Sequence, residues 1–210
     1  APNSAEETMA ARDISLAEMV GGRAHLAHIS TRGTLELVRR AKESGIAVTC
    51  EVTPHHLTLT DEAVIGRSNG DAPGNAPLTS SAYDTYAKVN PPLRTRQDIE
   101  AMVDGLNDGV IDFVATDHAP HNSFEKLCTF QEAAFGISVL ETALGSLLSL
   151  VYTGQLALPV LVERLTHAPA QFLGRADLGS LKPGSEADVT VFDPDAEWVV
   201  DTSRFSSKGK

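Results

Sequence analysis

The fold of this chain is decided by one stretch, Ile111-Asp112-Phe113-Val114-Ala115-Thr116-Asp117-His118-Ala119-Pro120-His121. Its beginning is mostly apolar and β-branched, which predicts a short buried strand, and the proline predicts an irregular loop after it. Strands buried on both faces occur in parallel α/β sheets, whose active sites lie at the carboxyl ends of the strands. Asp117, His118 and His121 therefore stand where such a sheet places metal ligands, proton carriers or groups that hold an anion. The competing interpretation is an Asp that caps its own turn and two surface histidines, and it would be preferred if this stretch stood alone.

Two earlier strands are predicted at residues 24–29 and 46–52, and both end near residues that can do chemistry. His28 lies at the end of the first strand, and Glu51, His55 and His56 cluster at the end of the second. Helices are predicted before, between and after the three strands. This alternation of helix and strand is typical of a parallel α/β sheet.

The predicted helices carry recognisable boundary signals. Ser4 and Glu7 form a capping-box pattern at the start of the first helix, and Gly21 ends it. The second helix ends at Gly45, and Thr95 caps the third. The buried stripes of these helices are Met9, Ala10, Ile14 and Ala17, then Leu35, Val38 and Ala41, then Ile99, Met102, Val103 and Leu106.

The second half of the chain is less regular. The apolar run 133–152 predicts one long buried helix, whose Gly, Ser and Glu residues argue against a membrane span. Helices opened by Pro159 and Pro169 follow it. Residues 65–82 are rich in Gly, Asn, Ser, Asp and Pro, which predicts a long loop, and 67–81 are expected to be poorly ordered. Residues 188–192 alternate like a strand with no helix after it, which indicates a separate small β unit.

Three strands that end in histidine or carboxylate favour a (β/α) barrel over a doubly wound sheet. No Gly-x-Gly-x-x-Gly turn or Gly-x-x-x-x-Gly-Lys loop follows any of them, so a nucleotide-binding sheet has no support. A complete (β/α)₈ barrel takes about 250 residues, and only three of its units are visible. We therefore expect the second half of a barrel over residues 1–176 and part of a small β domain over 177–210.

Composition limits the kinds of partner. The formal net charge of -11 argues against nucleic acid and anionic membranes, because phosphate binding needs a basic surface. Small anionic substrates stay open, since a few local groups can hold them. The two cysteines lie far apart in the chain, which predicts reduced thiols in a cytoplasmic protein. The polar N-terminus lacks the apolar segment of a signal peptide.

The candidate metal site rests on His28 and Asp117. Alternation along the strands would place Leu26 with His28 on one face, and Phe113 with Asp117 on one face. If both faces point into the barrel, His28 and Asp117 converge at its mouth, where imidazole and carboxylate suit Zn²⁺ or a similar divalent ion. Two ligands are too few for a site, so the others must come from elsewhere.

The remaining polar residues leave alternatives open. Glu51, His55 and His56 could be ligands or proton shuttles, but the preferred interpretation is structural, with Glu51 satisfying backbone or a histidine. Asn90 could donate to a substrate carbonyl or form a turn before Pro91, and the sequence favours neither. Lys88 and Arg94 are expected to be solvated rather than catalytic.

Several motifs together resemble one family, the class I (bacterial-type) dihydroorotases of the amidohydrolase superfamily. The motifs are Ala27-His28-Ile29-Ser30-Thr31, Glu51 to Leu57, Lys88-Val89-Asn90-Pro91-Pro92-Leu93-Arg94, Ala115 to His121, Phe135-Gly136-Ile137, Glu141-Thr142, and Leu181-Lys182-Pro183-Gly184 with Ala187-Asp188. The resemblance runs over essentially the whole chain. Hydantoinases and allantoinases share the scaffold, but a different motif is expected of them at the last strand, without Asn-Pro-Pro-Leu-Arg.

The resemblance implies a role for each matching residue. His28 matches the histidine ligand of barrel strand six, and Asp117 matches the strand-eight Asp that binds metal and acts as acid and base. His121, Asn90 and the backbone around Phe135 and Gly136 match positions that contact the substrate ring and carboxylate. The implied reaction is the reversible cyclisation of N-carbamoyl-L-aspartate to L-dihydroorotate in pyrimidine (UMP) biosynthesis, with one or two Zn²⁺ ions.

The resemblance also implies groups that this sequence does not contain. The strand-one histidine pair, the bridging lysine or aspartate, the strand-five histidine and the early carboxylate-binding residues are all absent. We therefore expect an incomplete fragment, inactive alone, whose remaining ligands come from a missing N-terminal half or a partner chain. A homodimer or an association with aspartate transcarbamoylase is a further expectation. The alternatives are a metal-free, dihydroorotase-like structural subunit and another cyclic amidohydrolase, a hydantoinase or allantoinase.

Overall fold

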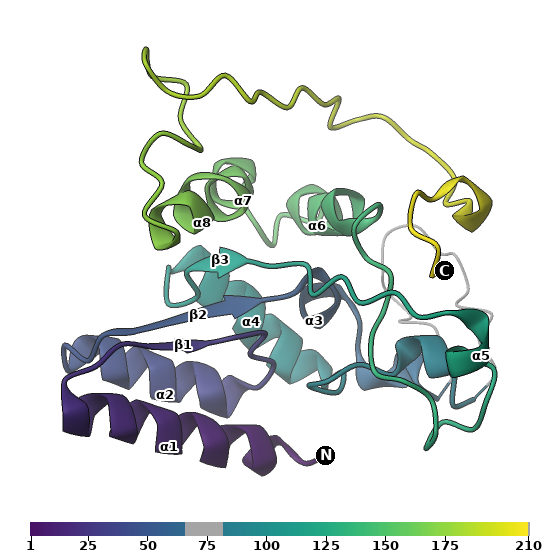
Figure 1. The fold of residues 1–210 in the computed structure, drawn as a ribbon, viewed down its shortest axis with the longest axis horizontal. Helices are drawn as coiled ribbons and strands as arrows, with labels where there is room; N and C mark the ends of the chain where they lie inside the picture. The colour runs from purple at the N-terminus through teal and green to yellow at the C-terminus, as the bar shows by residue number, and fades with distance from the viewer. Residues whose placement is uncertain (66–81, 210) are drawn as a thin grey trace.

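A computed structural model describes residues 1–65 and 82–209, and its centre is a parallel sheet (Figure 1). The strands are β1 (Ala24–Leu26), β2 (Val48–Val52) and β3 (Phe113–Val114), paired in the order β1-β2-β3. The sequential parallel order confirms the topology expected from the sequence. Each strand is shorter than predicted: β1 ends earlier, β2 begins later, and β3 is shorter at both ends.

Long helices flank this sheet. The helices α1 (Asn3–Val20) and α2 (Arg32–Glu43) lie below it in Figure 1, and α4 (Arg96–Asn107) packs against α2. Their apolar faces bury Val38, Cys50, Met102 and Leu106 completely. The predicted stripes of α2 and α4 are confirmed, as is the Thr95 cap, which accepts a hydrogen bond from the backbone N–H of Asp98.

The remaining helices are shorter, and α6 to α8 lie above the sheet in Figure 1. Their bounds are α3 (Pro54–Thr58), α5 (Ser123–Lys126), α6 (Ala143–Tyr152), α7 (Leu158–Leu165), α8 (His167–Phe172), and the 3₁₀ turns η1 (Asp61–Ala63), η2 (Thr85–Ala87) and η3 (Thr202–Arg204). The prolines predicted to open α7 and α8 lie within their first turns. None of the helices in the described ranges is long and apolar enough to cross a membrane.

The register of the sheet corrects the expected division of its faces. His25 lies opposite Thr49, and Glu51 lies opposite Phe113, so these residues share one face. Leu26 belongs to the other face, with the core side chains, and not to the face of Phe113. The strand-alternation argument for His28 and Asp117 was therefore wrong, because both residues lie beyond the last paired residue of their strand.

Three other local predictions were wrong. Helix α1 begins at Asn3 after Pro2 with no side-chain cap, so Ser4 and Glu7 form no capping box. The helix predicted over 133–152 begins only at Ala143, because its first part is tied to neighbouring loops. Residues 188–192 form no strand, since none of the described segments pairs with them. The loop predicted at 67–81 lies outside the described residues.

Candidate active site

His28 and Asp117 lie in the turns that follow β1 and β3, and both have a left-handed backbone conformation. Their φ angles are 41° and 46°, and Tyr83 is the one other non-glycine residue of the described part with a positive φ. This conformation costs about 1–3 kcal/mol for an L residue and persists where the surroundings impose it, often at functional sites. The two residues that the sequence proposed as metal ligands thus share an uncommon backbone geometry at the carboxyl edge of the sheet.

The loop after His28 is held by buried hydrogen bonds. Ile29 donates its N–H to the Glu51 carbonyl at 2.9 Å. The Glu6 carboxylate of α1 accepts from the backbone N–H groups of Ser30 at 2.9 Å and Thr31 at 3.1 Å, and also from the Ser30 hydroxyl. An anion at this place suits the positive N-terminal end of α2. The backbone that carries His28 is therefore fixed from both sides.

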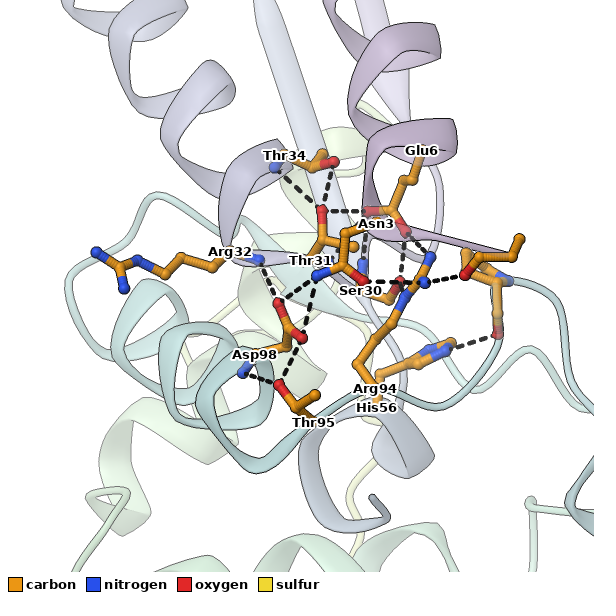
Figure 2. Close-up of polar contacts among 12 residues, drawn as sticks. Asn3, Glu6, Ser30, Thr31, Arg32, Thr34, His56, Arg94, Thr95 and Asp98 are labelled. Atoms are coloured by element: carbon orange, nitrogen blue, oxygen red, sulfur yellow. Dashed lines mark hydrogen bonds and ion pairs between the residues drawn. The ribbon is translucent and has the colours of Figure 1, made fainter. Parts of the chain in front are cut away.

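Arg94 connects this loop to the Asn-Pro-Pro-Leu-Arg segment (Figure 2). Its guanidinium donates to the Ser30 hydroxyl at 3.0 Å and to the Asn3 side-chain oxygen at 3.1 Å, and pairs with Glu6 at 3.3 Å. Arg94 is 6% exposed, so the expectation that it is solvated was wrong. Sequence reasoning missed its partner Glu6, because nothing distinguishes that residue from the other acids of an amphipathic helix.

Asp98 forms a second anchor beside the first (Figure 2). Its carboxylate accepts hydrogen bonds from the Asn3 side-chain amide at 3.0 Å, from the backbone N–H of Arg32 at 3.1 Å and from the Thr95 hydroxyl at 2.8 Å. Asn3 contacts both Asp98 and Arg94. These contacts join the starts of α1, α2 and α4 at the end of the sheet where His28 lies.

His56 has a structural role, as the sequence suggested. Its Nδ1 lies 2.8 Å from the Thr53 hydroxyl, and its Nε2 lies 2.9 Å from the Pro91 carbonyl oxygen. The carbonyl can only accept, so Nε2 carries the proton and Nδ1 accepts from the hydroxyl. Burial lowers the pKa of His56 to about 4, which keeps the ring neutral. The ring thereby links the end of β2 to the segment that carries Asn90.

His55 is buried in the same turn with different surroundings. Neither of its ring nitrogens has a hydrogen-bond partner among the described residues, and Nδ1 of His28 is also buried without one. Burial, with His56 and His28 nearby, lowers the pKa of His55 to about 3. His55 and His28 thus place buried, unpaired ring nitrogens at the carboxyl edge of the sheet, where a cation or a hydrogen-bond partner could use them.

The loop after β3 holds Asp117 in a different way. Asp117 is exposed, and its carboxylate makes no hydrogen bond to any described residue. The next residue, His118, accepts at Nδ1 from the N–H groups of Val139 at 3.0 Å and Leu140 at 3.1 Å. The histidine after Asp117 therefore orients the loop, while the carboxylate remains available for a ligand or a proton.

His121 links the same loop to residues 131–137. Its Nε2 lies 2.9 Å from the Phe135 carbonyl, and its Nδ1 lies 3.2 Å from the Glu125 carboxylate. Gly136 has a φ of 139°, and a Cβ added there would lie 2.5 Å from the Ala119 carbonyl oxygen, so only glycine fits. His121 and the Phe135–Gly136 backbone, which the family resemblance implied as substrate contacts, thus lie next to each other.

Asn90 and Lys88 occupy contrasting positions in the Asn-Pro-Pro-Leu-Arg segment. Asn90 is exposed. Lys88 is 7% exposed, so the expectation that it is solvated was wrong. Its ammonium donates to the carbonyls of Gln131 and Ala133. Sequence reasoning missed this role, since a lysine that binds backbone carbonyls has no sequence signal.

The side chains at the carboxyl edge of the sheet could supply part of a metal site. An imidazole and a carboxylate at His28 and Asp117 suit Zn²⁺, which takes three protein ligands in catalytic sites. Within residues 1–65 and 82–209, no group of three or more His, Cys, Asp or Glu residues is arranged to hold a metal ion. The described residues therefore supply members of a ligand set and not a complete one.

The described residues form an α/β fold, and its candidate site lies at the carboxyl ends of parallel strands. A model of the amidohydrolase family matches residues 3–209, and the chain belongs to that family. It is 50% identical over 210 residues to a dihydroorotase of Thermoanaerobacter sp. (strain X514), covering 100% of this chain and 44% of the relative. A dihydroorotase of Geobacter metallireducens is 49% identical over 209 residues, with 100% of this chain and 45% of the relative covered. The chain thus spans about half the length of the curated relatives it matches.

Solved structures agree on the fold. A D-hydantoinase structure has a TM-score of 0.79 and 26% identity, and covers 92% of this chain and 41% of its own. The L-hydantoinase of Arthrobacter aurescens has a TM-score of 0.73 and 29% identity, with 86% and 38% covered. Sequence identity is therefore much higher to the dihydroorotases than to these hydantoinases.

Proposed function

We propose that the protein containing this chain is a dihydroorotase, which cyclises N-carbamoyl-L-aspartate to L-dihydroorotate and catalyses the reverse ring opening. The observation that carries the proposal is 46–50% identity to curated dihydroorotases across the chain. The side chains expected of such a site also stand at the strand ends. His28 and Asp117 follow β1 and β3, and His121 meets the Phe135 carbonyl.

Each residue has a part in this reaction. His28 and Asp117 would hold a divalent ion, which lowers the pKa of a bound water and polarises the amide carbonyl. Asp117 accepts a proton as the ring amide is attacked and returns it to the departing nitrogen. Its exposed carboxylate, free of hydrogen bonds to the described residues, suits that exchange. Asn90 and the Phe135–Gly136 backbone contact the ring.

His121 would hold the substrate carboxylate. Both its ring nitrogens face acceptors, the Phe135 carbonyl and the Glu125 carboxylate. Since both nitrogens are engaged, the substrate carboxylate would replace Glu125, whose bond of 3.2 Å is the longer of the two.

The architecture proposed with this function is half of a (β/α)₈ barrel. Strands β1 to β3 would be its strands six to eight, within residues 1–176. Residues 177–210 would belong to a small β domain, whose strands need partners outside the described residues. A cavity of about 500 Å³ between α6, α7 and residues 178–192 fits a loosely packed boundary of this kind.

The proposal extends to cofactor, partners and location. Zn²⁺, one ion or two, fits the imidazole and carboxylate donors, with further ligands from the rest of the protein. The substrate is a small anion and the protein is placed in the cytoplasm, where this biosynthesis would run. Homodimerisation or association with aspartate transcarbamoylase is proposed from family resemblance alone.

The test uses the full-length protein that contains this sequence. Ring opening of L-dihydroorotate and cyclisation of N-carbamoyl-L-aspartate are assayed beside hydantoin and allantoin, with metal content measured on the same samples. Asp117→Asn should lower kcat by more than about 10²-fold, because proton transfer contributes 10²–10⁴-fold and a ligand is weakened too. Turnover of hydantoin but not dihydroorotate would identify a hydantoinase, and a metal-free inactive protein would identify a structural subunit.

A further inference from the structure

Two lysine ammonium groups are buried under the loop that approaches His121. Lys88 and Lys126 are 7% and 2% exposed. No carboxylate lies within 4.0 Å of either Nζ atom among the residues that the structure describes. A buried lysine is unusual unless its charge is well compensated. The compensation here comes from backbone carbonyl oxygens.

Lys126 uses all three of its N–H donors on carbonyl groups. Its Nζ lies 2.6 Å from the Gly136 oxygen, 2.8 Å from the Ala134 oxygen and 3.0 Å from the Thr85 oxygen. An ammonium group has three donors, so this set is complete. Burial and the neighbouring Lys88 lower the pKa of Lys126, which agrees with two cations placed close together.

Lys88 holds the preceding carbonyls of the same loop. Its Nζ lies 2.6 Å from the Ala133 oxygen and 2.9 Å from the Gln131 oxygen. It also lies 4.4 Å from the centroid of the Phe135 ring, within the range of a cation–π contact. The Lys88 backbone carbonyl in turn accepts from the Gly136 N–H at 2.9 Å.

The geometry points to Lys88 and Lys126 as positioning residues that fix the backbone of residues 131–136 beside His121. Between them the two ammonium groups bind four carbonyls of this segment, and His121 binds that of Phe135. The segment is not helical, so these carbonyls have no partner from regular structure. The inference deepens the proposed function and rests on it, because Phe135 and Gly136 are its substrate-contacting backbone.

A small movement of this segment would reach the site. Gly136 is packed so closely that an added Cβ would lie 3.1 Å from Cδ2 of His121 and 2.5 Å from the Ala119 oxygen. The loop after Asp117 therefore rests directly on the segment that the lysines hold. Removing the Lys88 ammonium leaves two carbonyls without their donor, and removing the Lys126 ammonium leaves three. We expect the Phe135–Gly136 backbone to shift in either case.

The experiment compares Lys88→Met and Lys126→Met with Lys42→Met in the full-length protein. Methionine keeps the apolar stem and removes the charge. Lys42 is a matched control, since its ammonium also binds a backbone carbonyl, that of Val110 at 2.9 Å, but beside Asp112 at the far end of β3. Steady-state kinetics, metal content, melting temperature and amide hydrogen exchange of residues 131–137 are measured for all three.

Lys88→Met and Lys126→Met should each raise KM for dihydroorotate about 10- to 100-fold with a smaller change in kcat, since a misplacement of about 1 Å can cost 10²-fold. Metal content should stay at the wild-type value, and exchange at 131–137 should accelerate. Lys42→Met should lower the melting temperature without either effect. Unchanged KM and unchanged exchange in both variants would overturn the proposal, as would losses equal to those of Lys42→Met.

Hydrogen exchange separates this inference from the proposed function. If the wild-type protein does not turn over dihydroorotate but both variants accelerate exchange at 131–137, the two lysines hold the loop and the dihydroorotase assignment fails. If the wild-type protein is active and the variants match it in KM and exchange, the lysine inference fails and the assignment stands. If one variant does not fold, the other carries both measurements.

Discussion

At the scale of single residues, the candidate site depends on backbone conformations that side chains seldom adopt. His28 and Asp117 each have a positive φ in the loop after their strand, at about 1–3 kcal/mol of strain. The surroundings differ: the His28 loop is fixed by the Glu6 carboxylate, and the Asp117 loop by Nδ1 of His118. These contacts fix both loop backbones without any ligand. His28 and Asp117 would therefore already be positioned for a metal ion.

His121→Ala is expected to weaken substrate binding and to leave the metal in place. A hydrogen bond to a charged group contributes about 1.5–3 kcal/mol, so KM should rise roughly 10- to 100-fold. Metal analysis and steady-state kinetics of the full-length variant check this. Loss of bound metal in this variant would contradict the assignment, because it would make His121 a metal ligand and not a substrate contact.

His55→Phe is expected to change how stability depends on pH. The folded-state pKa of His55 is about 3 and its ordinary value is 6.5, so the unfolded chain binds the proton first as pH falls. Stability that is fully present above pH 6.5 is lost as pH falls toward 3, by about 2 kcal/mol at pH 5 for this one group. Phenylalanine removes that contribution.

Urea unfolding of the full-length protein at pH 7.5 and pH 5 measures the difference. The variant should lose less stability between the two values than the wild-type protein does. At pH 7.5 it should be no less stable, because His55 has no hydrogen-bond partner to lose among the described residues. A large loss at pH 7.5 would mean that groups beyond those residues bind the His55 nitrogens.

At the scale of elements, the sequence correctly predicted those features that depend on apolar periodicity and on helix caps. The parallel strand order, the buried stripes of α2 and α4 and the Thr95 cap follow from apolar spacing and local hydrogen bonds. The late start of α6 was not predictable, because carbonyls in residues 133–136 are bound by Lys126 and by Lys88, which lies 45 residues from Ala133. The end of β1 was also misplaced, because the chain turns at residues 27–28, and beyond this turn Glu6 of α1 accepts from the backbone N–H groups of Ser30 and Thr31.

In the candidate site, too, some residues could be found from the sequence and others could not. Residue types at strand ends identified His28, Asp117 and His121, and the family resemblance added Asn90, Phe135 and Gly136. The supports Glu6, Lys88 and Lys126 were missed, because an acid on a helix and a lysine in a loop are ordinary in sequence. Their burial, 14% exposure for the Glu6 side chain and 2% for Lys126, appears only when elements pack.

Glu6→Gln is expected to destabilise the junction of α1, α2 and α4. It leaves Arg94 as a buried unpaired cation, and removing one partner of a buried pair costs about 3–5 kcal/mol. Because Gln keeps an oxygen for the Ser30 and Thr31 N–H groups, we expect a loss of about 2–4 kcal/mol in unfolding free energy. The matched control is Glu36→Gln, since Glu36 forms an exposed pair with Arg40 at 2.8 Å within α2.

The control should cost no more than about 0.5 kcal/mol, as is usual for exposed helix pairs. Urea titration of both full-length variants gives the comparison. Equal losses would show that the Glu6–Arg94 contact contributes no more than a surface pair, and that the His28 loop is held by other contacts.

At the scale of the whole molecule, the sheet is open on both sides. Among the described residues β1 and β3 each pair with β2 alone, and an unpaired strand edge exposes backbone N–H and C=O groups. The face with His25, Thr49 and Glu51 is only partly buried, although His25 bonds to both, at 2.9 Å and 3.3 Å. A closed barrel would pair those edges and enclose that face, which is the arrangement proposed for the full-length protein.

The open sheet leads to a prediction about zinc. The 210-residue chain alone should bind Zn²⁺ more than about 100-fold more weakly than the full-length protein. Removing even a residue that only hydrogen-bonds to a metal ligand lowers metal affinity about 10- to 100-fold, and here whole ligands would be absent. Competition against a chromophoric chelator measures both affinities under the same buffer and pH. His28→Ala in the full-length protein is the control, and it should weaken zinc binding by removing one ligand. Tight stoichiometric binding by the chain alone would contradict the prediction, because it would require a complete ligand set within these residues.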